Sequence, residues 1–195
     1  MSTQVIPEAF FDSLSLAHKL DNFLDGFTLP EIHLFSYFSS ILFLYKGNPI
    51  SEWQYKFIVD TNGYPFSTEI NEATTRHVQN GLFENSNNSN YYSITGRGTD
   101  EFSKFKALTM FKRREEYLNA ACTTSILVPY TETERALLND FEIGKAKSLE
   151  NPSWLDQSIT YQKFQEISQA VGISADELVI PAITWVNYLT EKSKN

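Results

Sequence analysis

The chain has 195 residues, of which 42% are hydrophobic and 14% aromatic, a composition that predicts a folded core and excludes disorder throughout. Its net charge of −8 lacks the basic footprint typical of nucleic-acid-binding proteins. The single cysteine, Cys122, cannot form an internal disulfide and favours a reducing, cytoplasmic setting. The sequence starts without a signal-peptide pattern, and its most apolar stretch, residues 32–45, is too short to span a bilayer. We therefore expect no membrane association.

Charge is distributed unevenly along the chain. Residues 1–40 hold one lysine against five acidic residues, and residues 121–195 hold six basic residues against ten acidic ones. Residues 41–120 hold nine of each kind. The middle of the chain is therefore neutral within an acidic protein, which permits contact with DNA but does not by itself indicate it.

The first predicted element is a helix over residues 7–24, which ends before Gly26. Thr28 and Glu31, three residues apart, form the signature of a capping box. The helix that they begin runs to about Lys46. Because apolar residues cover nearly all of its circumference, we expect it to be a central core helix.

The middle of the chain predicts two more helices and a hairpin. A short helix is expected over residues 51–58, and a turn over residues 60–63. A further helix follows over residues 67–80. Two β-favouring runs, residues 82–84 and 91–94, flank an Asn- and Ser-rich tip and predict a β-hairpin.

The last part of the chain is predicted to be helical. A long helix is expected over residues 99–128, and the best linker candidate is residues 150–153. A helix over residues 159–170 is followed by a second one that begins at a capping box at Ser174. Pro181 should kink that last helix.

These elements predict a mostly α fold with a small β-hairpin, in the α+β class. We divide the chain into an N-terminal helix over residues 1–27, a domain over residues 28–98, a long connecting helix over residues 99–128 and a C-terminal helical region over residues 129–195.

The order helix, short helix, helix, hairpin and long helix is that of a winged helix-turn-helix. Residues 66–83, in which a serine precedes a helix that a glycine ends, resemble the third-helix-to-wing segment of this superfamily. Residues 92–98 resemble the wing-return segment of regulators of the PadR and MarR kind. The resemblance covers residues 30–98 and implies a winged-helix core with helical N- and C-terminal extensions. An unrelated α+β domain with one hairpin is the alternative.

The third helix of the resemblance would present its outer face to DNA or to a partner protein. The residues predicted to face the core are Ile70, Ala73, Thr74 and His77. Asn, Gln and Arg are suited to reading bases, so the candidate contact residues on the outer face are Asn71, Thr75, Arg76 and Gln79. Glu69 and Glu72 on the same face would be repelled by phosphates.

Further candidate contact residues lie on the predicted wing and beyond it. They are Asn87 and Asn88 at the hairpin tip, Arg97 at its return, and Lys112, Arg113 and Arg114 on the long helix. The tip contains no Lys or Arg, although DNA-binding wings commonly carry one. The basic run predicts either a positive flank or simply a solvated helix face, since Glu115 and Glu116 follow it.

Residues 164–174 show the Gly and Ser placement of a second helix-turn-helix. The helix after them is too apolar to read DNA, so Trp185 and Tyr188 are candidates for apolar docking on a partner. A plain helical hairpin is the alternative. With a second module, the chain resembles the small tandem winged-helix accessory subunits of chromosome-structuring (SMC-like) ATPase complexes and of related bacterial antiviral defence complexes.

Patterns that would indicate catalysis are missing from the sequence. The three histidines have no metal-ligand spacing, and neither a nucleophile elbow nor a phosphate-binding loop occurs. We therefore predict no catalytic residue, no metal site and no cofactor. The leading hypothesis is a non-enzymatic subunit that docks on a larger partner, such as a DNA-handling ATPase or a defence complex. The alternative is a homodimeric transcriptional regulator that binds DNA directly.

Overall fold

The computed structural model describes residues 5–86, 90–148, 154–155, 157–172 and 177–193. The fold is mostly helical and includes a small antiparallel sheet, as predicted. The helices are α1 (Pro7–Leu24), α2 (Leu29–Tyr45), the 3-10 helix η1 (Ile50–Trp53), α3 (Thr68–Gln79), α4 (Gly96–Lys106), α5 (Thr109–Leu127), α6 (Tyr130–Leu138), α7 (Phe141–Lys147), α8 (Ser158–Val171) and α9 (Val179–Lys192). The strands are β1 (Phe27–Thr28), β2 (Ile58–Val59), β3 (Pro65–Phe66), β4 (Phe83–Asn85) and β5 (Tyr91–Ile94).

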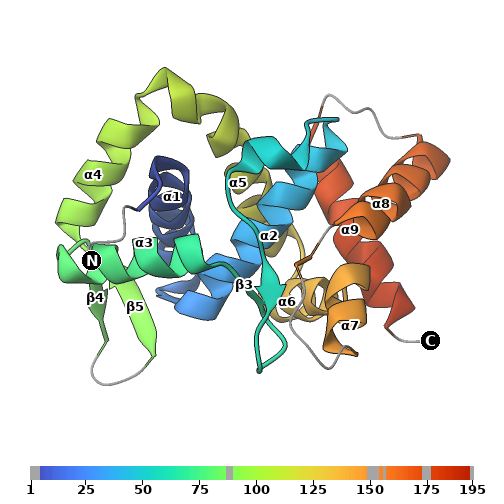
Figure 1. Ribbon diagram of the computed structural model, residues 1–195, viewed down its shortest axis with the longest axis horizontal. Helices are drawn as coiled ribbons and strands as arrows, with labels where there is room; N and C mark the ends of the chain where they lie inside the picture. Colours follow the sequence, from blue (N-terminus) through green and yellow to red (C-terminus); the bar gives the residue numbers. More distant parts are fainter. Residues whose placement is uncertain (1–4, 87–89, 149–153, 156, 173–176, 194–195) are drawn as a thin grey trace.

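Helices α2 and α5 lie in the middle of the molecule (Figure 1). On one side they pack against α1, and α1 in turn contacts α3, α4 and β5. On the other side α2 contacts α8, and α5 contacts α6 and α9. Both predictions for α2 are confirmed, because it is buried on nearly every side and its capping box is formed. The Glu31 amide donates to Thr28 Oγ1 (3.4 Å), and the Thr28 amide donates to Glu31 Oε2 (2.6 Å).

The predicted short helix over residues 51–58 is mostly wrong. Only the single turn of η1 forms, and the chain then extends into β2. Trp53, Tyr55 and Phe57 are buried, whereas Gln54 and Lys56 between them are exposed. This alternation with a period of two is the pattern of an extended segment, not of a helix. The predicted turn over residues 60–63 joins β2 to β3, which pair antiparallel.

The predicted hairpin is confirmed as β4 paired antiparallel with β5. A third strand, β1, pairs with the other edge of β5, so the strand order is β1–β5–β4. Phe27 of β1 lies opposite Tyr92 of β5. Gly26 precedes β1 with a φ of 126°, and a Cβ at this position would lie 2.3 Å from the Tyr91 ring. Glycine is therefore required where α1 turns into the sheet.

The single helix predicted over residues 99–128 is two helices, α4 and α5, which meet at a bend at Leu108. The bend allows both helices to pack on α1. The Phe105 ring of α4 contacts Phe10 with 5.4 Å between ring centroids, and the Phe111 ring of α5 contacts Phe11 at 4.4 Å. A straight helix would carry one of these rings away from α1.

In the C-terminal region, α8 and α9 form the predicted helix pair and contact each other. Pro181 does not kink α9, because it lies in the first turn, where helix amides have no intrahelical partner to lose. The predicted linker at 150–153 lies outside the described residues, as does the predicted capping serine, Ser174.

Candidate functional site

The predicted core face of α3 is confirmed: Ile70, Ala73, Thr74 and His77 are its buried residues. Of the predicted outer face, Asn71, Thr75 and Gln79 are exposed, and Arg76, Glu69 and Glu72 are half-buried. The Ser67 hydroxyl donates to Glu69 Oε2 (2.7 Å) at the start of the helix. The face therefore combines small polar groups with two carboxylates and one guanidinium.

Arg97 is the only other predicted contact residue that the described structure brings to the end of α3. It is exposed in the first turn of α4. The N-cap of α4 is Thr95, whose hydroxyl donates to the carbonyl of Gly81 (2.9 Å), two residues after α3 ends. Asn87 and Asn88, predicted at the hairpin tip, lie outside the described residues.

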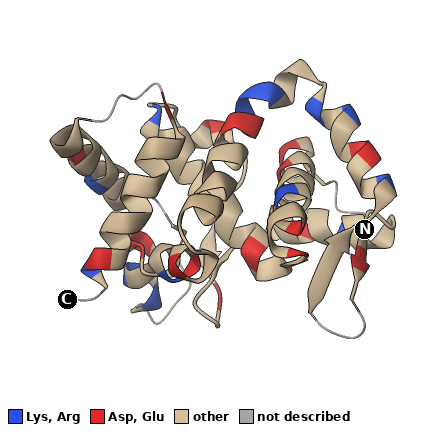
Figure 2. Cartoon of the chain, turned by 180° about the vertical axis from the view of Figure 1, so that it is seen from behind, with Lys and Arg blue, Asp and Glu red and all other residues tan. Residues whose placement is uncertain are grey.

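The exposed basic residues around the bend between α4 and α5 form a second surface, the basic elbow (Lys104, Lys106, Lys112 and Arg113). It is far from the β4–β5 hairpin, at the opposite end of α4 (Figure 1), and Lys and Arg gather there in Figure 2. Leu108 and Met110 are exposed between these cations. The basic run therefore does not flank the outer face of α3.

The prediction that Arg114 contacts DNA or a partner is wrong, because Arg114 is buried and belongs to the core. Its guanidinium donates to both oxygens of Asp12 (2.7 and 2.6 Å) and to the carbonyl of Trp53 (3.1 Å), and it lies 3.8 Å from the Trp53 ring centroid. The Tyr55 hydroxyl also donates to Asp12. Burial raises the pKa of the Asp12 carboxyl, and the Arg114 charge opposes that shift. We call these four residues the buried ion-pair cluster.

The prediction that Trp185 docks on a partner is also wrong, because Trp185 is fully buried. Its ring stacks on Phe164, with 5.1 Å between ring centroids, and on Tyr188 (5.7 Å). Tyr188, the other predicted docking residue, is half-buried and stacks on Phe141. The apolar character of α9 therefore serves its packing within the chain.

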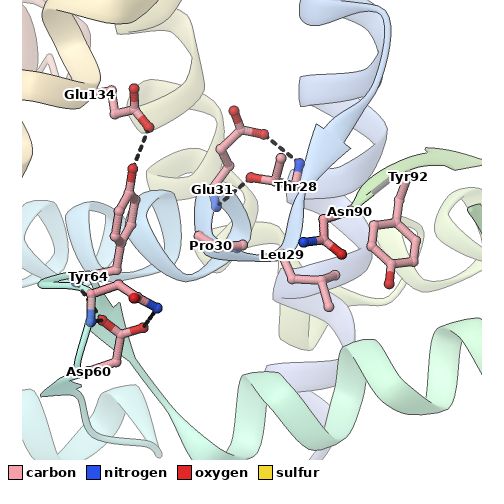
Figure 3. Close-up of a pocket in the computed structure, with 10 residues that line it drawn as sticks. Thr28, Leu29, Pro30, Glu31, Asp60, Tyr64, Asn90, Tyr92 and Glu134 are labelled. Carbon is pink, nitrogen blue, oxygen red and sulfur yellow. Dashed lines mark hydrogen bonds between the residues drawn. The ribbon is translucent and has the colours of Figure 1, made fainter. Parts of the chain in front are cut away.

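A pocket of about 510 Å³ opens beside the start of α2 (Figure 3). It lies between the turn that joins β2 to β3, the strand β5 and helix α6. Its lining residues are Thr28, Leu29, Pro30, Glu31, Asp60, Asn62, Tyr64, Asn90, Tyr92 and Glu134. Three of them are acidic, and none is Lys, Arg or His.

Hydrogen bonds hold the carboxylates of this acidic pocket in place. The Tyr64 hydroxyl donates to Glu134 Oε1 (2.9 Å), and the Tyr130 hydroxyl donates to Glu31 Oε1. Asp60 Oδ1 accepts the amides of Asn62 (2.9 Å) and Tyr64 (2.8 Å) and so closes the turn. Burial, and after it the bond to Glu134, raises the pKa of Tyr64 to about 12.

Sequence reasoning missed the acidic pocket. The sequence identifies Glu31 only as a cap of α2, and Tyr64 and Glu134 are 70 positions apart in the sequence. Their contact depends on how α6 and the β2–β3 pair both pack on α2, which no local pattern indicates. The aromatic and polar character of the 60–64 turn was visible, but nothing in it identified the carboxylate that it would face.

The residues that the structure describes contain no group of three or more His, Cys, Asp or Glu side chains placed to hold a metal ion. Cys122 is buried, and burial raises the pKa of its thiol to about 12, so the thiol is protonated at neutral pH. Within the same described part of the chain, every helix is too short or too polar to cross a membrane.

Comparison of the chain with protein-family models, with curated proteins and with solved structures finds no match.

Proposed function

We propose that this protein is a non-enzymatic, cytoplasmic interaction subunit with a winged-helix core. The order α1, β1, α2, α3, β4, β5, with η1 and the β2–β3 pair inserted between α2 and α3, and the strand order β1–β5–β4 support that core, because a winged helix packs three helices against a small sheet that ends in a hairpin. In this assignment the core begins with α1, near residue 7, and not at residue 28.

The observation that carries the interaction function is the charge of the outer face of α3. Glu69 and Glu72 outnumber the single Arg76 on this face. Most DNA affinity comes from neutralising phosphates, so such a face is poorly suited to enter a DNA groove. Its exposed Asn71, Thr75 and Gln79 suit hydrogen bonding to a protein surface.

The partner that we propose is a larger subunit of a complex, such as a DNA-handling ATPase or an antiviral defence complex. This part of the proposal rests on the resemblance to winged-helix accessory subunits. Because Trp185 is buried, we do not propose that α9 docks on the partner. The proposed docking surface is the outer face of α3.

A homodimeric DNA-binding regulator is the second candidate, and the basic elbow favours it. Its four cations lie within residues 104–113, and of these Lys104 pairs with Glu101 (3.0 Å) and Lys106 with Glu115 (3.7 Å). A DNA complex made through this surface would depend on Lys112 and Arg113, and would weaken steeply with salt.

An electrophoretic mobility-shift titration of the full chain against its own upstream DNA, at low and physiological salt, separates the two candidates. We expect no sequence-specific complex. Nanomolar binding that is lost in Lys112→Gln/Arg113→Gln would refute the interaction subunit and support the regulator.

A second experiment captures a partner from the native host. Capture should be lost in Thr75→Arg/Gln79→Arg and retained in Lys112→Gln/Arg113→Gln, which is the matched control.

A further inference from the structure

The acidic pocket combines three carboxylates with an apolar wall. We propose that it binds an arginine or lysine side chain presented by the partner protein. The existence of such a partner rests on the proposed function, whereas the chemistry of the pocket does not.

The charge of the pocket is only partly balanced within the chain. Glu31, Asp60 and Glu134 line it from three different elements, and no ion pair of the described residues includes any of them. The Lys147 side chain packs against Gly63. Burial lowers the pKa of its amine, and the nearby Asp60 charge opposes that shift. The Lys147 amine donates to the carbonyl of Leu138 (3.0 Å), which fixes it outside the lining. Both oxygens of Glu31 already accept hydrogen bonds within the chain, from the Thr28 amide and the Tyr130 hydroxyl, so Glu134 is the carboxylate that can receive an incoming cation.

The walls of the pocket suit the stem of a long basic side chain. Leu29 and Pro30 form an apolar surface at the start of α2, and the Tyr92 ring stands beside them (Figure 3). Lys and Arg bury their methylene stems against such surfaces while the charged head reaches polar groups. Glu134 Oε1 already accepts a hydrogen bond from the Tyr64 hydroxyl, which leaves Oε2 as the acceptor for the incoming head group.

Two other classes of ligand fit the pocket poorly. The carboxylates do not form one of the convergent groups that a metal ion needs. An anion, including a nucleic-acid phosphate, would face three carboxylates with no cation in the lining. A cationic side chain satisfies both the charge and the apolar wall.

The test is an NMR titration of the isotope-labelled full chain with two short peptides that differ in one side chain. The first contains a central arginine, and the second contains citrulline, which has the same shape and no charge. We expect arginine-dependent shifts of the amides of Tyr64, Tyr92 and Glu134. Binding should be weak, with a Kd on the order of 1 mM for a single side chain. Equal shifts with citrulline would overturn the proposal.

Matched variants locate the effect in the pocket. Glu134→Gln should weaken arginine binding at least about tenfold, the effect of one charge-assisted hydrogen bond. Glu132→Gln removes the same charge from an exposed position of α6 outside the pocket and should leave binding unchanged. Asn90→Arg would place a cation of the chain itself at the rim and should block the peptide. Unchanged binding in Glu134→Gln would overturn the proposal.

One outcome would identify a different occupant, and another would test the proposed function separately. If a second copy of the chain inserts its basic elbow into the pocket, the protein self-associates and Glu134→Gln abolishes that self-association; this result would overturn the assignment to a partner protein. Failure of the proposed function would appear differently, as nanomolar DNA binding by a chain whose arginine-dependent shifts are intact.

Discussion

Tyrosine hydroxyls donate to carboxylates both in the interior, where Tyr55 meets Asp12, and in the acidic pocket, where Tyr64 meets Glu134. The interior carboxylate has its own cation, Arg114, which is also buried. The pocket carboxylate has no cation beside it in the lining and faces solvent. Similar donors and acceptors therefore serve different ends in the two regions. A carboxylate paired within the chain joins helices, whereas one left unpaired at an opening can serve a partner.

The largest expected effect follows from removing the interior cation. Arg114→Ala leaves Asp12 buried without its counter-charge and should lower the free energy of unfolding by about 3–5 kcal/mol. Lys112→Ala, two positions earlier on α5, removes an exposed cation and should change the free energy of unfolding by less than about 0.5 kcal/mol. Urea denaturation monitored by circular dichroism measures both.

A paired substitution checks the reason for that loss. Asp12→Asn combined with Arg114→Met removes both charges and should be less destabilising than Arg114→Ala alone, because no unpaired charge remains. If the double variant loses more stability than the single one, the uncompensated carboxylate is not the cause.

The next effect is a loss of stability in acid. Burial lowers the pKa of His33 to about 4 and that of His77 to about 3, so both are neutral in the folded protein and bind protons on unfolding below pH 6.5. Stability should be highest above pH 6.5 and fall toward pH 4, by roughly 2 kcal/mol per histidine at pH 5.

Burial raises the pKa of Asp140 to about 6. Its contribution has the opposite sign, since it is present at low pH and lost as the pH rises through 6.

Urea denaturation at pH 7 and pH 5 tests this prediction. His77→Gln should lose less stability between the two pH values than the unaltered chain, and Asp140→Asn should lose more. An unaltered pH dependence in His77→Gln would show that this imidazole is not the group that titrates on unfolding.

The smallest expected change in stability distinguishes the pocket from the interior. Glu134→Gln keeps the shape of the side chain and removes a charge that no ion pair of the described structure uses, so its free energy of unfolding should shift by less than about 0.5 kcal/mol. A loss comparable to that of Arg114→Ala would mean that this carboxylate serves the fold.

The parts of the fold that local chemistry determines were predictable. The capping box of Thr28 and Glu31 marked the start of α2, and the spacing of Ile70, Ala73 and His77 identified the buried face of α3. The strand β1 was not predicted, because two residues carry no pattern and only their pairing with β5 makes them a strand. The bend at Leu108 was missed because neither Gly nor Pro marks it.

The burial of Arg114 and the extended conformation around Trp53 and Tyr55 could both have been predicted from the spacing of neighbouring residues. Arg114 follows Phe111 by three positions and precedes Leu118 by four, which places it on the buried stripe of α5. Trp53 and Tyr55 alternate with polar residues, a period that indicates an extended chain. The acidic pocket had no such signal, because its carboxylates come together only through tertiary packing.

The short strand β1 has one more consequence. It joins the acidic pocket to the β4–β5 hairpin, since Thr28 of β1 lines the pocket and lies opposite Tyr91 of β5 in the sheet. A side chain that binds against Tyr92 contacts the strand that carries the hairpin. Two residues of sheet therefore place the wall of the pocket and the edge of the hairpin side by side.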